Sequence, residues 1–314
     1  MKTSHWLNLF LAVCLFYLPS NAVRAAESPS PIKILIVDGF GNHDWKRTTK
    51  LARGILDATG LFQVTVSTAP GSTNDPAYAT WSPGFTNFDV VIQTCNDLGG
   101  RGPLWPAPAR TAFEQFVRDG GGVLIFHSGN NAFADWDAYN QIIGLGWRKK
   151  DFGYALRIGA NEVVERIPPG EGNNTSHGAR TDRVLHQLGE HPIHAGMPRR
   201  WKTPAIEVYT YARGPAKNVT VLSSAEEPKT QERWPIEWTV QWGKGRIYNS
   251  TFGHVWLGEA DPVDMRCAGF QTVLVRSLQW LAKRPVTFPV PADFPTADAT
   301  VLRTMPATFE LHRQ

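Results

Sequence analysis

Strand patterns alternate with amphipathic helical patterns through the first half of this chain. The strand patterns, most of them almost wholly apolar, occupy residues 32–37, 62–67, 88–92 and 122–126. Apolar residues at helical spacing follow at residues 45–59, 109–118 and 135–143. Continuous apolar strands are typical of parallel sheets that helices cover on both faces. The order of these segments therefore predicts an α/β fold with a mostly parallel, doubly wound sheet.

The second half of the chain has a different pattern. Strand-like segments follow one another at residues 156–167, 207–212, 219–223, 236–241 and 246–251. The last two are joined through Trp242-Gly243-Lys244-Gly245, which is a hairpin signal. A final helix is expected at residues 267–281, and the proline-rich tail at 285–314 should be extended. We therefore expect one domain over residues 30–284, with antiparallel strands added to the parallel sheet in the C-terminal half.

Residues 1–25 have the pattern of a secretory signal peptide. Lys2 precedes an apolar core at residues 9–18, and small residues lead to an expected cleavage site after Ala25. The core is too short to span a bilayer as a mature helix. A valine precedes Cys14, which disfavours a lipoprotein signal. We therefore expect an exported protein, periplasmic or secreted, with no membrane partner once the leader is removed.

The composition argues against two classes of protein. The 314 residues carry a formal net charge of only +4 at pH 7, part of which comes from Lys2 and Arg24 of the leader. A charge this small is not the basic footprint of a nucleic-acid-binding protein. Outside the leader the cysteines are Cys95 and Cys267, which are too few for a disulfide framework. Whether these two cysteines are bridged or free stays open.

Two histidines follow expected strands directly. His127 comes after the apolar run at residues 122–126 and opens a polar loop that contains Asn130 and Asn131. His254 follows a glycine after the last expected strand. Open α/β sheets bind their ligands outside the carboxyl ends of the strands. We therefore expect both histidines to be functional and to lie at one edge of the sheet, although a histidine bonded to a loop carbonyl is the structural alternative.

A third histidine, His43, lies in the segment that leaves the first strand. The segment runs from Asp38 to Trp45, turns on two glycines and carries Asp44 as the expected N-cap of the following helix. A glycine turn with a capping aspartate explains every feature of the segment except His43. By its position His43 is a further candidate for the functional site.

The segment around residues 190–209 offers other polar candidates. His191 and His194 flank a proline turn, where a histidine often has a structural role, so both interpretations stay open. Glu207 and Tyr209 begin the strand pattern at residues 207–212. Because a shift of one residue in register turns a strand residue to the other face, the side on which Glu207 lies is ambiguous.

Several motifs in order resemble the ThuA-like (trehalose utilisation) family. They are the run that ends at His127, the stretch Phe133-Ala134-Asp135-Trp136, the motif His191-Pro192-Ile193, the segment Glu207-Val208-Tyr209 and the end Gly253-His254. The resemblance covers residues 33–281, and several motifs in one order are far more specific than any single motif. One departure is visible, because such proteins usually carry an acid before the glutamate and this chain has Ile206.

The resemblance implies a flavodoxin-like sheet similar to that of class I glutamine amidotransferases. In those enzymes a cysteine stands on the elbow after a strand, and a histidine follows a later hairpin. By that comparison His127 takes the place of the nucleophile and His254 that of the base. Amidotransfer requires a cysteine that forms a thioester, so we do not expect a glutamine amidotransferase. Cys95 is a weak substitute, because the sequence shows no base beside it.

A site built from His43, His127, His254 and Glu207 admits two kinds of chemistry. Neutral imidazoles and a carboxylate suit a divalent metal such as zinc, with an open position for a water or a sugar hydroxyl. No HxH or HExxH spacing supports a metal, but distant ligands leave no such signature. Without a metal, one histidine could remove a proton beside a sugar carbonyl while a second donates a proton elsewhere. The sequence leaves the cofactor open.

The family is linked with disaccharide catabolism in which the glycoside is first oxidised to a 3-keto form. The resemblance therefore implies an exported enzyme, of isomerase, lyase or hydrolase type, that acts on a 3-keto-glycoside or a related sugar. His43, His127 and His254 would be acid-base residues or metal ligands, and Glu207 would orient or ligate. Two alternatives stay open, a non-catalytic carbohydrate-binding module and a metal-dependent hydrolase of another substrate.

The expected partner is a small sugar or glycoside. We expect Asn130 and Asn131 to bind its hydroxyl groups. Trp45, Trp136 and Trp256 lie next to the candidate loops, where indole faces can stack on sugar rings. Packing in the core is the simpler explanation of a tryptophan.

Overall fold

The structure is a computed structural model that describes residues 30–305. The expected leader at residues 1–25, with Cys14, and the end of the tail at residues 306–314 lie outside the described residues. Between residues 30 and 305, no helix combines the length and the apolarity that crossing a membrane requires.

Five parallel strands form one half of a 12-stranded sheet. In spatial order they are β2 (Phe62–Thr68), β1 (Ile32–Asp38), β3 (Val90–Gln93), β4 (Gly122–Ile125) and β14 (Gly245–Ser250). This is the strand order of flavodoxin-like folds, with β14 in the fifth place. The predicted α/β sheet is confirmed.

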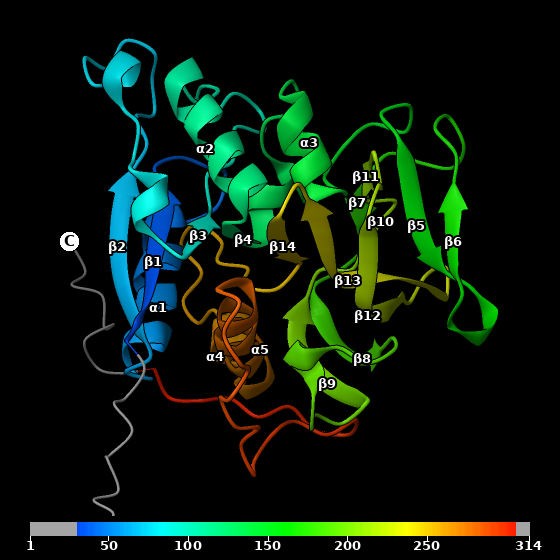
Figure 1. Cartoon of the computed structure of the whole chain (residues 1–314). Coiled ribbons are helices and arrows are strands. Elements are labelled where there is room, and N and C mark those ends of the chain that lie inside the picture. The colour runs from blue at the N-terminus through cyan, green and yellow to red at the C-terminus, as the bar shows by residue number, and fades with distance from the viewer. Residues whose placement is uncertain (1–29, 306–314) are drawn as a thin grey trace, which may run out of the picture. The chain divides into compact units, whose positions relative to one another are not determined.

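Helices cover both faces of the parallel half (Figure 1). They are α1 (Trp45–Asp57), α2 (Ala107–Asp119), α3 (Asp137–Ile143), α4 (Val263–Arg266) and α5 (Ala268–Leu281). Helices α1 and α5 bury their apolar stripes in one core layer, and α2 and α3 bury theirs in the other. Asp44 caps α1 as predicted, since its Oδ1 accepts a hydrogen bond from the backbone N–H of Arg47 at 3.0 Å.

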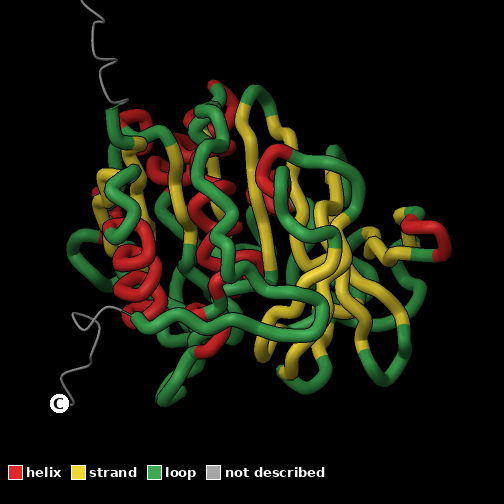
Figure 2. The backbone as a smooth tube through the Cα atoms, turned by 90° about the horizontal axis from the view of Figure 1, so that it is seen from below, coloured by secondary structure: helices red, strands yellow, loops and turns green. Residues whose placement is uncertain are grey.

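Antiparallel strands continue the sheet beyond β14. In spatial order they are β13 (Glu232–Trp242), β12 (Val219–Glu227), β8 (Thr181–Gln187) and β9 (Arg200–Ile206). A side branch holds β5 (Tyr154–Ile158), β6 (Val164–Ile167) and β11 (Arg213–Gly214). A separate pair joins β7 (Ser176–His177) to β10 (Tyr209–Thr210). Figure 2 shows that strands and loops make up nearly all of this half, whereas the helices gather over the parallel half.

The predicted hairpin through residues 242–245 is confirmed, because Trp242 pairs with Gly245 where β13 turns into β14. Two other strand predictions are wrong. Residues 156–167 are not one strand but the hairpin β5–β6, in which Asn161 and Glu162 have positive φ angles of 56° and 62°. Gly159 and Asn161 are residue types that favour turns, but the strand-like pattern continues on both sides of them.

The segment at residues 207–212 is not a continuous strand either. Strand β9 ends at Ile206, Glu207 lies in the following loop, and only Tyr209–Thr210 are paired as β10. Tyr211 has a φ of 52°, which ends the extended backbone. Glu207 therefore lies on neither face of the sheet, because it is the first residue after strand β9.

Aromatic side chains fill much of the core. Trp105, Trp201, Trp234 and Trp238 are at most 1% exposed, so packing accounts for several of the twelve tryptophans. Cys95 and Cys267 are buried in this core, and neither forms a disulfide within residues 30–305.

The described part of the tail, residues 285–305, runs as an extended segment along the lower side of Figure 1. Arg276 of α5 donates a hydrogen bond to the carbonyl of Phe288. The carbonyl of Thr296 accepts a hydrogen bond from the backbone N–H of Lys202 at 2.7 Å, and Phe294 packs on Trp201 at a centroid distance of 5.3 Å. These contacts hold the segment against α5 and β9.

Candidate active site

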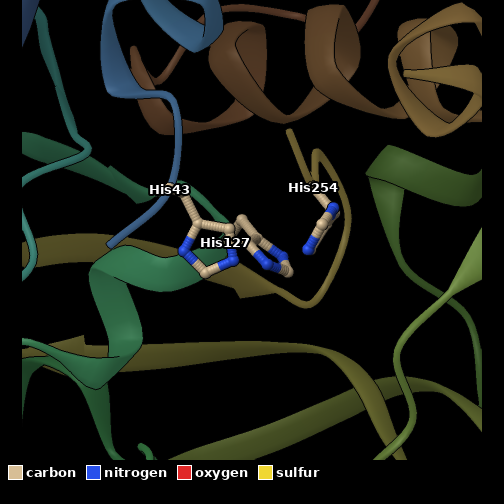
Figure 3. A group of neighbouring side chains, drawn as sticks. All are labelled: His43, His127 and His254. Atoms are coloured by element: carbon tan, nitrogen blue, oxygen red, sulfur yellow. The ribbon is translucent and has the colours of Figure 1, made fainter. Parts of the chain in front are cut away.

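Three histidines meet at the carboxyl edge of the parallel strands. His43 lies in the loop after β1, His127 after β4 and His254 after β14. Their ring centroids are separated by 4.9 Å (His43 to His127), 4.8 Å (His43 to His254) and 5.0 Å (His127 to His254). Figure 3 shows the three rings side by side, each carried by a different segment. The three histidines that follow predicted strands therefore lie together at the edge of the sheet where ligands bind.

The three histidines also meet a condition for metal binding. One donor atom from each lies within 4.8 Å of the others. In the part of the chain that the structure describes, this is the single place where three His, Cys, Asp or Glu side chains could share an ion.

The backbone that carries two of these histidines is unusual. His127 has a φ of 41°, in the left-handed region that non-glycine residues rarely adopt, as it turns from β4 into one turn of 3₁₀ helix (His127–Asn131). Gly253, before His254, has a φ of 88°, and a Cβ there would lie 2.2 Å from the ring of Phe126. Buried Asp264 accepts hydrogen bonds from the N–H groups of Gly253 and His254 at 2.6 and 3.0 Å. The loop before His254 is therefore held by close packing on Phe126 and by two hydrogen bonds to Asp264.

Glu207 joins the histidines from the antiparallel half of the molecule. Its Oε2 lies 3.6 Å from Nε2 of His127, and its Oε1 lies 3.4 Å from Nε2 of His254. Its Oε1 is also 3.5 Å from Nε2 of His177, a residue of β7. The side chain of Glu207 is only 6% exposed, so this carboxylate is a buried part of the cluster.

Hydrogen bonds behind two rings determine which ring nitrogen carries the proton. Nδ1 of His127 lies 2.9 Å from the carbonyl oxygen of Thr251, which can only accept, so Nδ1 donates. Nδ1 of His43 lies 3.0 Å from Oδ1 of Asn42, which also accepts from Nδ2 of Asn96 at 2.6 Å. Both rings therefore carry a lone pair on Nε2. Nε2 of His127 is buried and has no hydrogen-bond partner among residues 30–305.

Burial keeps the histidines neutral. It lowers the pKa of His43 to about 4 and that of His254 to about 3, and the positive charge of Arg180 lowers both further. Burial, followed by the proximity of the other two histidines, lowers the pKa of His127 well below its ordinary value. The pKa of Glu207 moves in the opposite direction, because burial raises it. A cluster of neutral imidazoles around a carboxyl group with a raised pKa is typical of a functional site.

Acidification should destabilise the folded protein through His43. The unfolded chain binds a proton at the ordinary pKa of 6.5, whereas folded His43 does so only at about 4. A lowered histidine pKa contributes stability above pH 6.5, and this contribution is lost as the pH falls toward 4. We expect the free energy of unfolding to fall by about 2 kcal/mol more in the wild type than in His43→Asn between about pH 7 and about pH 4.5.

Urea denaturation of EDTA-treated protein at the two pH values measures this difference. The variant is the necessary control, because the raised pKa of Glu207 acts with the opposite sign and is present in both proteins. An equal pH dependence of the two proteins would contradict the expectation.

Two of the three predicted tryptophans lie at the cluster. The ring of Trp256 is 4.9 Å from that of His43 and stacks at 14° on that of His254, 5.8 Å away, while 46% of the residue stays exposed. Trp45, with His43 and His127, lines a cavity of about 10 Å³, which is room for about one water molecule. Trp256 is therefore an exposed indole face directly beside the histidines.

The structure does not place Trp136, Asn130 and Asn131 where a sugar can reach them. Trp136 is 3% exposed, and its Nε1 donates to Oε1 of Glu114 at 2.7 Å within an aromatic core cluster. Asn130 and Asn131 are 0% and 5% exposed, because the 3₁₀ turn folds them inward beneath the loop that follows α3. The expectation that Asn130 and Asn131 bind sugar hydroxyl groups is therefore corrected, because both side chains are buried in the structure.

The sequence reasoning missed three charged or titratable residues around the cluster. His177 stacks on Tyr209 at 24° and packs against Trp147, and its side chain is 34% exposed. Nη2 of Arg180 lies 3.0 Å from Oε1 of Glu259, whose Oε2 is 3.5 Å from Nδ1 of His254. These residues lie in the irregular second half, where no strand-end pattern marks them.

His191 and His194 lie outside the cluster. Nε2 of His194 contacts Oε1 of buried Glu237 at 3.1 Å, next to helix α5. The ring of His191 packs on Trp280 at 4.9 Å, and its Nδ1 accepts from the N–H of Ile193. The structural interpretation of both residues agrees with these contacts.

A comparison with protein families decides the identity of the chain. The sequence profile of the family described as trehalose utilisation, ThuA, matches residues 33–281. The chain belongs to the ThuA family. Among curated proteins none matches this ThuA protein. A solved ThuA-like protein from Parabacteroides merdae is similar at 30% identity, over 87% of this chain and 98% of that chain, with a TM-score of 0.80.

A second solved ThuA-like protein, from Bacteroides uniformis, shares the fold at 18% identity. The match covers 81% of this chain and 94% of that chain, with a TM-score of 0.50. In this ThuA protein the residue before Glu207, Ile206, is fully buried in the core. An acid at this position would need a partner in that apolar layer, so the departure from the family pattern agrees with the local packing.

Proposed function

We propose that this ThuA protein is an exported enzyme that acts on a 3-keto-glycoside or a related sugar. The observation that carries the proposal is the carboxylate of Glu207, buried within 3.4–3.6 Å of Nε2 of His127, His177 and His254. Family membership supports the sugar, because the family is described by trehalose utilisation. His127 stands at the turn after β4 where a thioester-forming enzyme would have a cysteine, so the chemistry does not proceed through a thioester.

The first chemical step is removal of a proton from the carbon between the ketone and the anomeric carbon. The ketone makes this C–H bond acidic, and Glu207 is the base that takes the proton. The electron pair forms the C1–C2 double bond, and the C1–O bond to the aglycone breaks. The departing oxygen takes up a proton, so the products are an unsaturated keto sugar and a free alcohol or sugar. Reprotonation without loss of the aglycone gives isomerisation instead.

The geometry supports Glu207 as the base rather than a histidine. Burial raises the pKa of Glu207, which makes its carboxylate a better proton acceptor. Burial lowers the pKa of His43 and His254, so these rings are weak bases and cannot act as imidazolium acids near neutral pH. His177 contacts Glu207 and is partly exposed, so it can receive the proton from Glu207 and pass it to the departing oxygen or to solvent.

Trp256 supports a ring-shaped ligand over the cluster. The residue is 46% exposed, and its indole ring lies against those of His43 and His254. Exposed aromatic faces bind the apolar face of a sugar ring while its hydroxyl groups reach polar neighbours. A sugar stacked on Trp256 would therefore lie beside the imidazoles and Glu207.

Proton NMR of the protein with 3-keto-trehalose or 3-keto-cellobiose in D₂O tests the proposal. We expect loss of the C2 proton signal by exchange, accompanied by release of the aglycone if elimination follows. Trehalose and cellobiose themselves are the matched controls, because without the ketone their C2 protons are not acidic. Binding of the keto sugar with neither exchange beyond the enzyme-free rate nor any product would overturn catalysis and favour the carbohydrate-binding module. Turnover with no loss of C2 protium would overturn the proposed step and favour hydrolysis.

A further inference from the structure

We propose that His43, His127 and His254 bind one divalent transition-metal ion of the zinc class, with an open coordination position beside Glu207. The inference rests on the proposed function only for the role of the ion in the reaction. The binding itself follows from the arrangement of the three rings and from the groups that hold them.

The ring centroids have the spacing expected of a three-histidine metal site, and one donor nitrogen of each ring lies within 4.8 Å of the others. Zinc–nitrogen bonds of about 2.0–2.1 Å in tetrahedral geometry place the centroids of three imidazole ligands about 5 Å apart. The three centroid separations here are 4.8, 4.9 and 5.0 Å. Because these separations are nearly equal, the ring centroids form a nearly regular triangle. The ring planes lie at 81–84° to one another. Perpendicular planes are also common in edge-to-face packing, so the assignment of a metal rests on the ring nitrogens and the groups behind them.

The groups behind the rings prepare their nitrogens for a cation. Metal-binding histidines usually donate the N–H of the second nitrogen to a carbonyl or a carboxylate, which orients the ring. Here His127 donates to the carbonyl of Thr251, and His43 donates to Oδ1 of Asn42, which Asn96 also holds. His254 has Glu259 Oε2 at 3.5 Å from Nδ1, opposite the nitrogen that faces Glu207. Each ring therefore has an oxygen 2.9–3.5 Å from its Nδ1, which leaves Nε2 as the nitrogen available to a cation.

One buried atom points directly to a missing partner. Nε2 of His127 carries a lone pair, is buried, and has no hydrogen-bond donor among the described residues. An unsatisfied buried acceptor costs free energy unless a cation or a donor meets it. A zinc ion bound to Nε2 satisfies it together with the other two rings.

Three histidine ligands leave the fourth position of a tetrahedral ion free for water or substrate, as in catalytic zinc sites. Glu207 lies on this side, since its two oxygens face Nε2 of His127 and of His254. A sugar with a ketone next to a hydroxyl group offers two adjacent oxygens to such an ion. The ion would polarise the carbonyl and so make the proton that Glu207 removes more acidic.

Metal content measured without a histidine tag tests the inference. Full-length protein is produced with its leader, the tag is cleaved, and the protein is stripped with EDTA and then dialysed against ZnCl₂ or CoCl₂. Mass spectrometry counts the bound zinc, and the visible absorption of Co²⁺ reports its coordination. We expect about one zinc per chain, a four-coordinate cobalt spectrum, and loss of both in His127→Ala.

Two further variants keep the test decisive if His127→Ala folds poorly. Asn42→Ala removes the acceptor behind His43, together with its hydrogen bond from Asn96, and should weaken zinc binding about 10- to 100-fold. His191→Asn removes a histidine outside the cluster and should bind zinc like the wild type. Wild-type protein that takes up no zinc, or an Asn42→Ala affinity equal to that of the wild type, would overturn the inference.

The experiments can overturn the proposed function without overturning the metal site, and the reverse. Protein that binds one zinc but does not exchange the C2 proton overturns the proposed function and leaves the metal site standing. Protein that exchanges the proton after EDTA treatment and takes up no zinc overturns the metal site and leaves the proposed function standing.

Discussion

Replacement of Glu207 by glutamine should lower the rate of C2 proton exchange about a thousandfold, because the amide has the shape of the carboxyl group but cannot accept the proton. The affinity for the keto sugar should change little, since Trp256 and the three histidines remain. Exchange rates from NMR and sugar affinity from isothermal titration measure the two effects separately. A fall in rate without a fall in affinity identifies Glu207 as the base.

Glu190→Gln is the matched control for this variant, because Glu190 is an exposed carboxylate in the loop that carries His191. It should exchange the proton at the wild-type rate. If Glu207→Gln keeps more than a tenth of the wild-type rate, another group removes the proton and the proposed role of Glu207 is wrong.

Replacement of His194 by leucine should destabilise the protein by about 3–5 kcal/mol without affecting the chemistry. Glu237 is fully buried and accepts hydrogen bonds from Ser223, Tyr248 and His194. Burial alone would raise the pKa of Glu237, but the charge and the hydrogen bond of His194, helped by Ser223 and Tyr248, lower it. Loss of His194 therefore leaves a buried carboxylate without the hydrogen-bond partner that lowers its pKa.

Urea unfolding of His194→Leu and the wild type measures the loss. The double variant His194→Leu with Glu237→Leu should recover part of it, because it removes the unpaired carboxylate together with its partner. Proton exchange by the folded single variant should equal that of the wild type. A loss below about 1 kcal/mol would contradict the assigned structural role of the pair.

The parallel half of the fold and the three clustered histidines could be predicted because their signals are local. Strands covered on both faces are continuously apolar, and the glycines and Asp44 mark where the chain turns into a helix. Once these strands are taken as parallel, topology alone brings His127 and His254 to one edge. His43 followed from the same rule applied to the first strand.

The irregular half could not be read in the same way. The turn in β5–β6 rests on Asn161 and Glu162, which adopt positive φ angles without a glycine. His177 reaches Glu207 only because β7 pairs with β10, two short strands far apart in the sequence. Such pairings depend on side-chain packing across the sheet rather than on local propensity.

Local sequence patterns also did not predict which of the candidate side chains are buried. Trp136 and Trp256 both lie next to candidate loops, yet one is 3% and the other 46% exposed. The difference arises because Trp136 precedes α3 and packs into the aromatic core, whereas Trp256 lies beyond the strand end.

The sequence by itself determined the family, the parallel sheet and the edge at which the histidines gather, because apolar periodicity and strand ends are properties of neighbouring residues. The tertiary structure alone decided that Glu207 closes the cluster, that His177 stands beside it, and that Asn130 is buried. Those outcomes depend on contacts between segments far apart along the chain, whose energies come from packing and desolvation that no local pattern records.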